Sequence, residues 1–451
     1  MRRAGGAGIF RRRPPSSRYS RDNRTKMRCL IPLCLFLSVS AFAQSGANSG
    51  PTPKDVRLVA KDGQLAIPKL VPYLNSPSLD TRIEVVKQLT DLGGKDSLDA
   101  LITASHDPDP EMQLRAIDGL VNFYLPGYVR QGPAASVTRM GAAIKAKFSD
   151  TNDQTIDGFV TVRPEVIAAI GKLASGGNGM DVKASACRAI GILRGRAAIP
   201  DLLDALRTKD NTVMYEALVA IRKIGDASAG PKIVYLVRDL DDRVQSAAIE
   251  DAGLLRAKEG LPALRSIVAS PRGSKAERSA LSAIAMMPEP VDRPLFQRYL
   301  TSKDDRLRAA AVEGLGRIGD PGDRPVIDKV WKDEEKMPPR LASAFALTLS
   351  GDLELGESAP FRYLINTLNS AAWRDTATAY LVEAARRPAV LAALHQPLET
   401  GTRDEKIELA RILAASGDAT TIPWLDKLSR DPDSMVAQEG LRDLRSLRSR
   451  L

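Results

Sequence analysis

Histidine and cysteine are rare in this chain, and their spacing predicts no catalytic group. The chain contains two histidines, His106 and His395, and three cysteines, of which Cys29 and Cys34 lie in an apolar N-terminal stretch. The third, Cys187, would need a histidine base to act as a nucleophile, and neither histidine is near it in sequence. Cys187 falls within a helical pattern, so we expect a small buried side chain. The sequence therefore predicts no catalytic residues and no bound cofactor.

A group of acidic and amide residues from Asp150 to Gly158 is similar in composition to a calcium-binding loop. An EF-hand loop needs oxygen ligands at alternate positions and glycine at the sixth. Counted from Asp150, Gln154 takes the fifth position and Thr155 the sixth. We interpret the stretch as a polar, solvated loop and predict no metal site.

The stretch 304–320 shows the kind of element on which the rest of the chain is built. It reads DDRLRAAAVEGLGRIGD, with acidic residues suited to a helix N-terminus, small and apolar residues at helical spacing, and an end at Gly319. One such helix cannot bury its apolar face alone. The sequence therefore predicts a stack of helix pairs, in which each pair covers its neighbour.

Prolines give the length of the repeat. Two spacings of 31 residues separate Pro200, Pro231 and Pro262, and Pro294 and Pro325 are again 31 apart. In four units, apolar or small residues stand 13, 17 and 21 positions after the proline and share one helix face. These trios are Val213/Ala217/Ile221, Val244/Ala248/Ala252, Leu307/Ala311/Leu315 and Val436/Gly440/Leu444. Proline suits the first turn of a first helix, and the trio then lies on an antiparallel second helix. The expected fold is an all-α solenoid with one irregular insertion.

Charge and hydropathy indicate export. Ten of the 65 basic residues and one of the 55 acids fall within residues 1–43, so the remainder is nearly neutral and its bulk charge gives no reason to expect nucleic acid. Met27–Ala43 has a basic start, a short apolar run and an Ala-x-Ala end, which is typical of a signal peptide cleaved before Gln44. The run is too short for a membrane span. We expect an exported chain, periplasmic or extracellular, with no transmembrane span after cleavage.

These patterns divide the chain into six segments. Residues 1–26 are a disordered or misassigned extension, with an organelle transit peptide as the alternative, and an aromatic- and glycine-containing insertion interrupts the repeats. The expected segments are 1–26 extension, 27–43 signal peptide, 44–65 linker and start of the solenoid, 66–125 repeats, 126–162 insertion, and 163–451 repeats with a C-terminal cap.

The repeats resemble the HEAT repeat, and more closely the short HEAT-like repeat named after phycobilisome lyases. The residues that carry the resemblance are Asp241–Val244 with Ala247 and Ala248, Asp304–Arg308 with Ala310 and Ala311, and the endings Ile224-Gly225 and Ile318-Gly319. The resemblance implies the fold over most of residues 66–451, but little about function, because such repeats occur in adaptors, lyases, hydroxylases and glycosylases.

The known requirements of HEAT-repeat enzymes can be compared with this sequence. HEAT-repeat deoxyhypusine hydroxylases bind iron through His-Glu pairs, whereas His106 here precedes Asp107 and His395 precedes Gln396. The glycosylases act on DNA, which an exported protein would not meet. We therefore predict a scaffold that is not an enzyme and that binds a protein or peptide through an extended groove. The alternative is an enzyme of a HEAT-like class, of lyase, hydroxylase or DNA-glycosylase type, with an unrecognised site.

The candidate contact residues are those expected to point outward from second helices, together with aromatic residues at the insertion. Solvated helix faces explain the first group equally simply, and anchoring of the insertion loop explains the second. The candidates are Tyr215, Arg222, Arg243, Glu250, Arg308, Glu313, Arg317, Phe123, Tyr124 and Tyr128, with Phe148 as a further aromatic of the insertion.

Overall fold

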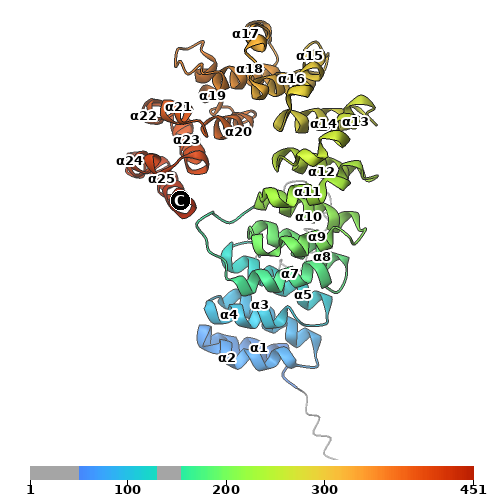
Figure 1. Cartoon of the computed structure of the whole chain (residues 1–451). Helices are drawn as coiled ribbons and strands as arrows, with labels where there is room; N and C mark the ends of the chain where they lie inside the picture. The colour runs from blue at the N-terminus through green and yellow to red at the C-terminus, as the bar shows by residue number, and fades with distance from the viewer. Residues whose placement is uncertain (1–49, 130–153) are drawn as a thin grey trace, which may run out of the picture. The chain divides into compact units, whose positions relative to one another are not determined.

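A computed structural model describes residues 50–129 and 154–451 of the chain. The extension and signal peptide predicted for residues 1–43, and Phe148 of the insertion, lie outside the described residues. Over the described ranges the chain forms helices and turns and no strand. The structure is thus the all-α solenoid that the repeat pattern predicts (Figure 1).

Each repeat consists of a first helix and an antiparallel second helix. An initial helix, α1 (Pro53–Val59), precedes the first pair. The first helices are α2 (Ile67–Leu70), α4 (Lys95–Ala104), α7 (Pro164–Gly176), α9 (Ile199–Ala205), α11 (Gly230–Ile233), α13 (Leu261–Ala269), α15 (Arg293–Tyr299), α17 (Arg324–Asp333), α19 (Pro360–Thr367), α21 (Pro388–Ala393) with α22 (His395–Thr400), and α24 (Ile422–Leu428). The second helices are α3 (Leu79–Leu92), α5 (Pro110–Tyr124), α8 (Met180–Ile192), α10 (Asn211–Ile224), α12 (Asp242–Leu254), α14 (Ser274–Met286), α16 (Asp305–Ile318), α18 (Met337–Leu349), α20 (Arg374–Ala384), α23 (Arg403–Ser416) and α25 (Ser434–Arg450).

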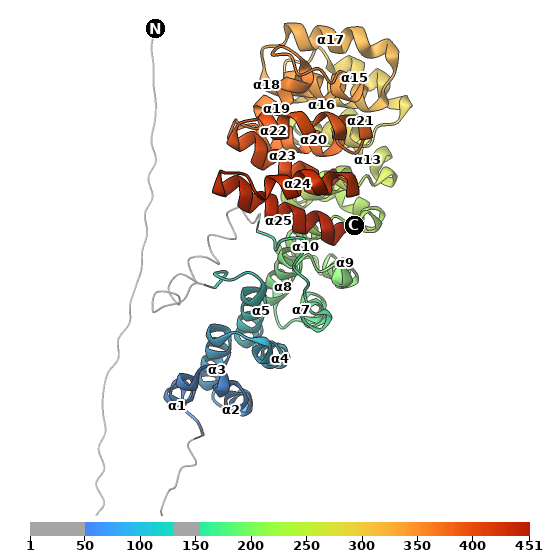
Figure 2. The ribbon, with the colours of Figure 1, turned by 90° about the vertical axis from the view of Figure 1, so that its left-hand side faces the viewer.

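The two kinds of helix form two layers. In Figure 2 the second helices α3, α5, α8 and α10 follow one another along one side, and the first helices α2, α4, α7 and α9 along the other. Successive second helices pack directly on one another from α3 through α25. The continuous surface that the second helices make is called the second-helix surface below.

Local sequence signals set where the helices begin and end. The prolines of the 31-residue spacing lie in the first turn of α9, α11, α13, α15 and α17, where a missing N–H breaks no helical hydrogen bond. Aspartates cap several second helices: Asp304 accepts from the backbone N–H groups of Arg306 and Leu307. That helix ends at Gly319, whose φ of 70° is the left-handed conformation favoured by glycine. Both ends of this element agree with the sequence prediction.

The trios counted from the prolines are core residues. Val213, Ala217 and Ile221, for example, are each 0% exposed. One unit departs from the count, because α14 buries Ala280 and Ile284, which stand 18 and 22 residues after Pro262. The turn before α14 is one residue longer, which also explains why the next proline follows after 32 residues rather than 31.

One element was not predicted from the sequence. Within residues 44–65, predicted only as linker and start of the solenoid, α1 begins at Pro53, and a 3₁₀ segment at residues 60–66 continues it to α2. Val56 is fully buried and holds α1 against α3. A single apolar contact on a short helix gives too weak a periodic signal to be recognised in sequence.

Small residues set the distance between second helices. Gly316 of α16 faces Ala346 of α18, and a Cβ placed on Gly316 would lie 2.4 Å from the Ala346 Cβ and 2.8 Å from its Cα. Gly314 faces the Phe296 ring, which a Cβ would meet at 2.3 Å. The low aromatic content of 5% fits this arrangement, because close helix contact leaves little room for large side chains.

Neighbouring repeats are joined by ion pairs as well as by apolar contacts. One row joins first helices or the turns before them: Arg196–Asp226, Arg265–Asp292, Arg293–Asp323 and Arg324–Asp352. Another joins second helices or the turns before them: Arg82–Asp107, Arg278–Asp304, Arg308–Glu334, Arg374–Asp404 and Lys406–Asp431. Exposed pairs of this kind contribute only about 0–1 kcal/mol each. Their main effect is to favour one lateral register between repeats.

None of the helices in residues 50–129 and 154–451 combines the length and the apolar character that crossing a bilayer requires.

We expect Gly316→Ala to lower the free energy of unfolding by about 1–3 kcal/mol, because the added methyl group overlaps the α18 backbone. Urea unfolding followed by circular dichroism would measure the loss. Gly356→Ala is the matched control, since a Cβ there meets no heavy atom within 4 Å. Equal stability of the two variants would contradict the close approach of α16 and α18.

Candidate interaction surface

Four of the predicted contact residues form one patch on α10 and α12. The Arg243 guanidinium lies over the Tyr215 ring, 3.7 Å from its centroid. Arg222 forms an ion pair with Glu250, whose side chain is 50% exposed. The patch therefore offers an aromatic ring, cations and an anion to solvent across two neighbouring repeats. Tyr215, Arg222, Arg243 and Glu250 are called the α10–α12 patch below.

A buried carboxyl group supports this patch from beneath. Asp251 is 0% exposed, and its Oδ1 lies 3.1 Å from Nε of Arg222, although the two groups are poorly aligned for a hydrogen bond. Burial raises the pKa of Asp251 well above its ordinary value, while Arg222 opposes this shift and Glu250 adds to it. Arg222 is therefore held between a buried and an exposed acid, which fixes its position in the patch.

A second cluster links repeats that are distant in sequence. Arg317 of α16 makes a two-pronged contact with Glu383 of α20, at 2.9 and 3.0 Å. The same guanidinium donates to a Glu313 carboxylate oxygen and to the Ala285 carbonyl, each at 2.9 Å. The Tyr380 hydroxyl donates to Glu313 at 2.5 Å. Every charged group in this cluster has a partner within the chain.

Arg256 adds a second cation to Glu383. It stands directly after α12, with its Nη2 3.2 Å from a Glu383 oxygen. Burial alone would raise the pKa of Glu383, but hydrogen bonding to Arg317 and the charges of both arginines lower it below the ordinary value. Arg256 has a φ of 54°, a conformation that costs a non-glycine residue about 1 kcal/mol or more. The ion pair with Glu383 offsets part of that cost.

The outward orientation expected for three candidates is wrong. The Arg317 side chain is only 8% exposed, and Glu313 is 16% exposed, because α20 covers this part of α16. Arg308 is 19% exposed and is held by Glu334 at 2.9 Å and by the Ser302 carbonyl. Helical periodicity indicates which residues leave the core, but not whether a distant repeat then covers them.

The aromatic candidates at the insertion lie against the stack. Phe123 and Tyr124 pack edge to face, 5.0 Å apart, and the Tyr124 hydroxyl accepts a hydrogen bond from the Arg163 backbone N–H at 3.1 Å. Tyr128 packs half-buried against the core. Tyr124 thus joins the last helix before the insertion to the residue just before α7, which favours the anchoring interpretation for this residue.

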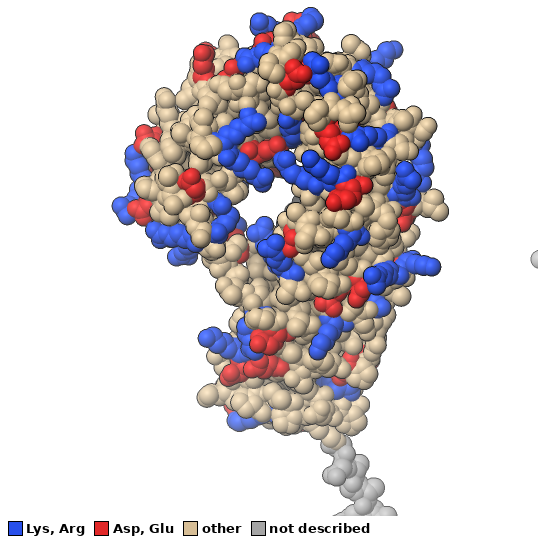
Figure 3. Space-filling view, viewed as in Figure 1, with Lys and Arg blue, Asp and Glu red and all other residues tan. Residues whose placement is uncertain are grey.

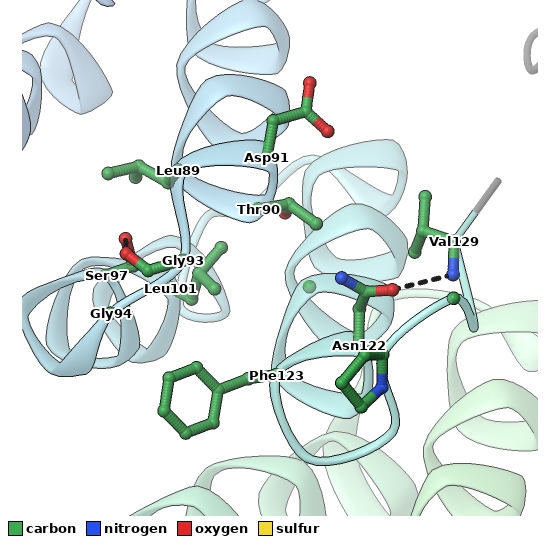
Figure 4. Close-up of a pocket in the computed structure, with 13 residues that line it drawn as sticks. Leu89, Thr90, Asp91, Gly93, Gly94, Ser97, Leu101, Asn122, Phe123 and Val129 are labelled. Carbon is green, nitrogen blue, oxygen red and sulfur yellow. Dashed lines mark hydrogen bonds between the residues drawn. The ribbon is translucent and has the colours of Figure 1, made fainter. Parts of the chain in front are cut away.

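A cavity of about 710 Å³ lies beside these aromatic residues, between α3, α4 and α5 (Figure 4). Its polar side chains are mostly committed to backbone groups: Asn122 accepts from the Val129 N–H, and Thr90 and Ser97 donate to carbonyls. It is lined by Leu89, Thr90, Asp91, Gly93, Gly94, Ser97, Leu101, Gly119, Asn122, Phe123, Pro126, Gly127 and Val129. No sequence pattern predicts this cavity, because its walls come from three helices and the loop that follows α5.

Cys187 and His395, which were considered for catalysis or metal binding, both pack against other side chains. Cys187 is 0% exposed, as predicted, and burial raises the pKa of its thiol far above the ordinary range. His395 stacks on Trp424 with ring centroids 4.2 Å apart. In residues 50–129 and 154–451 no three His, Cys, Asp or Glu side chains are grouped to hold a metal ion. The absence of a metal, a cofactor and catalytic residues stays a prediction.

The last helix contacts a segment far away in the sequence. Arg442 of α25 donates from Nε to Oδ1 of Asp157 at 2.9 Å, although 285 residues separate them. Asp157 belongs to the C-terminal part of the predicted insertion, which is held on α8 because the Ile156 N–H donates to the Ile192 carbonyl at 3.0 Å. The face of the molecule drawn in Figure 3 has a central hollow, and Lys and Arg side chains lie beside Asp and Glu side chains around it.

Asp443, next to Arg442, is a buried acid with incomplete hydrogen bonding. It is 6% exposed, and its Oδ2 has no hydrogen-bond partner among the described residues. Burial and the nearby Glu439 raise its pKa to about 7, against the opposing charges of Arg411 and Arg442. The packing of α25 therefore carries a group that titrates near neutral pH.

Comparison with known proteins gives the class of the repeats. A family model for HEAT repeats matches residues 67–134 and 167–252. The chain is 27% identical over 153 residues to the phycocyanobilin lyase subunit alpha of a Nostoc species, an alignment that covers 31% of this chain and 55% of that protein. The chain thus spans about half the length of this curated relative.

Solved structures of similar proteins include two enzymes. One is the complex of CpcE and CpcF of phycocyanin lyase from Nostoc, with 19% identity and a TM-score of 0.30 over 76% of this chain and 100% of that one. Human deoxyhypusine hydroxylase has 18% identity and a TM-score of 0.26 over 63% of this chain and 96% of its own.

The chain is a stack of helix pairs in which several first helices begin with proline and several second helices are capped by aspartate. Such a stack is an α-solenoid. The family match shows that residues 67–134 and 167–252 form HEAT repeats, which are similar to the phycobilisome-lyase type. This fold supports a scaffold or binding role.

We expect the stability of the α25 end to fall as pH rises through about 7. The folded pKa of Asp443 lies above its unfolded value, so the folded state holds the proton more tightly and gains stability below pH 7. Asp443→Asn should raise the melting temperature by several degrees at pH 8 and by less at pH 5. Thermal unfolding at both pH values measures this. An Asn variant that gains as much at pH 5 as at pH 8 would show that Asp443 does not titrate in this range.

Proposed function

We propose that this protein is an exported scaffold that binds a protein or peptide through its second-helix surface. The observation that carries the proposal is the α10–α12 patch, where an aromatic ring, cations and a half-exposed acid from adjacent repeats stand together. Arginine and tyrosine are among the residue types that contribute most to binding at protein–protein interfaces, because each combines a broad apolar surface with directional hydrogen bonding.

The geometry of the patch favours a partner that binds without rearranging the scaffold. Arg243 is already stacked on Tyr215, and Arg222 is held by Asp251 and Glu250. Side chains that are ordered before binding lose less conformational entropy when the partner docks. A partner would thus contact a preorganised surface. It would form hydrogen bonds to the Glu250 carboxylate and to the solvent-facing N–H groups of Arg222 and Arg243.

Export is the second part of the proposal, and it rests on residues 27–43. A basic start, an apolar run too short to span a bilayer and an Ala-x-Ala end support delivery across a membrane and cleavage before Gln44. The partner would then be another protein of the periplasm or of the cell exterior.

We expect the double variant Tyr215→Ala/Arg243→Ala to reduce capture of the partner from an envelope fraction by at least ten-fold, because it removes both members of the stacked pair. Quantitative mass spectrometry of proteins retained by immobilised wild-type and variant chains would measure the loss. Arg306→Ala is the matched control, as Arg306 is exposed on α16 away from the patch. A partner retained equally by the double variant would place its binding site elsewhere.

We expect the exported chain to begin at Gln44. Intact-mass analysis of the protein recovered from the envelope or medium would show the loss of everything before that residue. Leu35→Arg interrupts the apolar run and should leave the precursor uncleaved. A wild-type protein that keeps residues 27–43 inside the cell would refute export while leaving the binding proposal open.

A further inference from the structure

The cavity between α3, α4 and α5 is built from other helices than the α10–α12 patch and has the size of a small-molecule site. Its volume of about 710 Å³ falls within the range of about 300–1,000 Å³ that such sites occupy. Leu89 and Leu101 are 0% and 1% exposed, so they belong to its inner wall. Phe123 of α5 and Val129 of the following loop extend this apolar lining.

The polar side chains of the cavity leave few groups available to a ligand. Thr90 and Ser97 already donate to the carbonyl groups of Val86 and Gly93. The side-chain oxygen of Asn122 accepts from the Val129 N–H at 2.9 Å (Figure 4). The amide N–H groups of Asn122 form no hydrogen bond with the described residues, so they can donate to a carbonyl oxygen of a ligand.

Asp91 is the one charged residue among those that line the cavity, and no lysine or arginine lines it. The residue is exposed, which places it at the opening rather than at the inner wall. Within residues 50–129 and 154–451 its carboxylate forms neither an ion pair nor a hydrogen bond, although Lys87 lies one turn earlier on α3. The cavity therefore combines an apolar interior with a single acid at its mouth.

The position of Asp91 in α3 makes its negative charge unfavourable in the protein alone. It is the next-to-last residue of the helix, where the backbone carbonyl groups carry partial negative charge, and α3 has no basic residue in its last turn. The last turn of α5, with Asn122 and Phe123, also borders the cavity, and only α4 directs an N-terminus toward it. A cation at this place would offset the unfavourable charge.

The titration of Asp91 agrees with this description. Partial desolvation by the surrounding atoms raises the pKa of its carboxyl group above the ordinary value. Glu84 adds to the shift and Lys87 opposes it. Glu84 itself is paired with Arg57 at 3.2 Å, whereas Asp91 lacks such a partner among the described residues.

We propose that this cavity binds a primary amine with an apolar body, whose ammonium group pairs with Asp91 at the opening while the apolar body contacts Leu89 and Leu101. Two kinds of ligand have this chemistry: a free arylalkylamine, and the N-terminal residue of a peptide with a large apolar side chain. Asn122 would then donate to a carbonyl oxygen of the peptide. This site goes beyond the proposed scaffold function and does not depend on the α10–α12 patch.

The test uses isothermal titration calorimetry on the chain from Gln44 onward. The two amine ligands are phenethylamine and a tetrapeptide amide that begins with phenylalanine. Each has a neutral control with the same ring, namely phenethyl alcohol and the N-acetylated form of the same peptide. We expect at least one amine to bind about ten-fold or more tightly than its neutral control, because only the amine carries the cation that Asp91 attracts.

Variants locate the site. Asp91→Asn keeps the shape of the side chain and should weaken the bound amine by about ten-fold without changing the neutral control. Asp80→Asn is the matched variant, since Asp80 is an exposed acid at the other end of α3, and it should change the amine affinity little. Val129→Trp should abolish binding by filling the cavity, with circular dichroism as the check that each variant is folded. Equal amine affinity for Asp91→Asn and Asp80→Asn would overturn the proposal.

The pH dependence gives a second measurement. The amine pairs with the ionised carboxylate, so its affinity should fall as pH falls through the raised pKa of Asp91. In Asp91→Asn this dependence should disappear, which a merely structural role of Asp91 would not predict.

The two ligands distinguish the sources of the amine. Tighter binding of phenethylamine than of the peptide would identify a small amine as the ligand, and the reverse order would identify the N-terminus of a chain. Neutral controls that bind as tightly as the amines, or no binding of either amine, would overturn the proposal. Neither of these last results would affect capture of a partner at the α10–α12 patch.

Discussion

The structure depends on the burial of an apolar helix face that no single repeat can cover. Each second helix carries small and branched apolar residues on the side that meets its neighbour, as Val213, Ala217 and Ile221 do in α10. At about 25 cal/mol per Å² of apolar surface, such contacts supply the main favourable free energy of a stack. Glycine and alanine at the closest approach, as at Gly316 and Ala346, let the helices come near enough for these contacts to form. The architecture is thus a consequence of repetition.

Electrostatic interactions refine this arrangement. The ion pairs between adjacent repeats are individually weak where they are exposed. Where the carboxylate of a pair is buried, as in Asp292 and Asp323, a shift between repeats would leave a desolvated charge, so these pairs mainly fix the register. The cluster around Glu383 differs because it joins α16 and α20, and the paired arginines give that acid a lowered pKa despite its burial.

These constraints decide what the surface can offer a partner. Side chains already paired within the stack, such as Arg317 and Glu313, are held in place and largely covered. The α10–α12 patch differs from them, because it presents ordered side chains to solvent. A scaffold whose internal charges are mostly satisfied is selective, because only the few open positions attract a partner.

The sequence by itself determined the class of fold, the repeat length and most helix ends. Proline in the first turn, aspartate caps, left-handed glycine and the 3.6-residue period are local signals, and α16 follows them from Asp304 to Gly319. It also predicted that Cys187 is buried and included Tyr215, Arg222, Arg243 and Glu250 among ten candidate contact residues, but not that these four lie together. Only the tertiary structure decided that α20 covers Arg317, that a cavity opens beside Phe123, and that Arg442 reaches Asp157. Periodicity describes one helix and its immediate neighbours, whereas contacts between residues 66 or 285 positions apart depend on small rotations that accumulate from repeat to repeat.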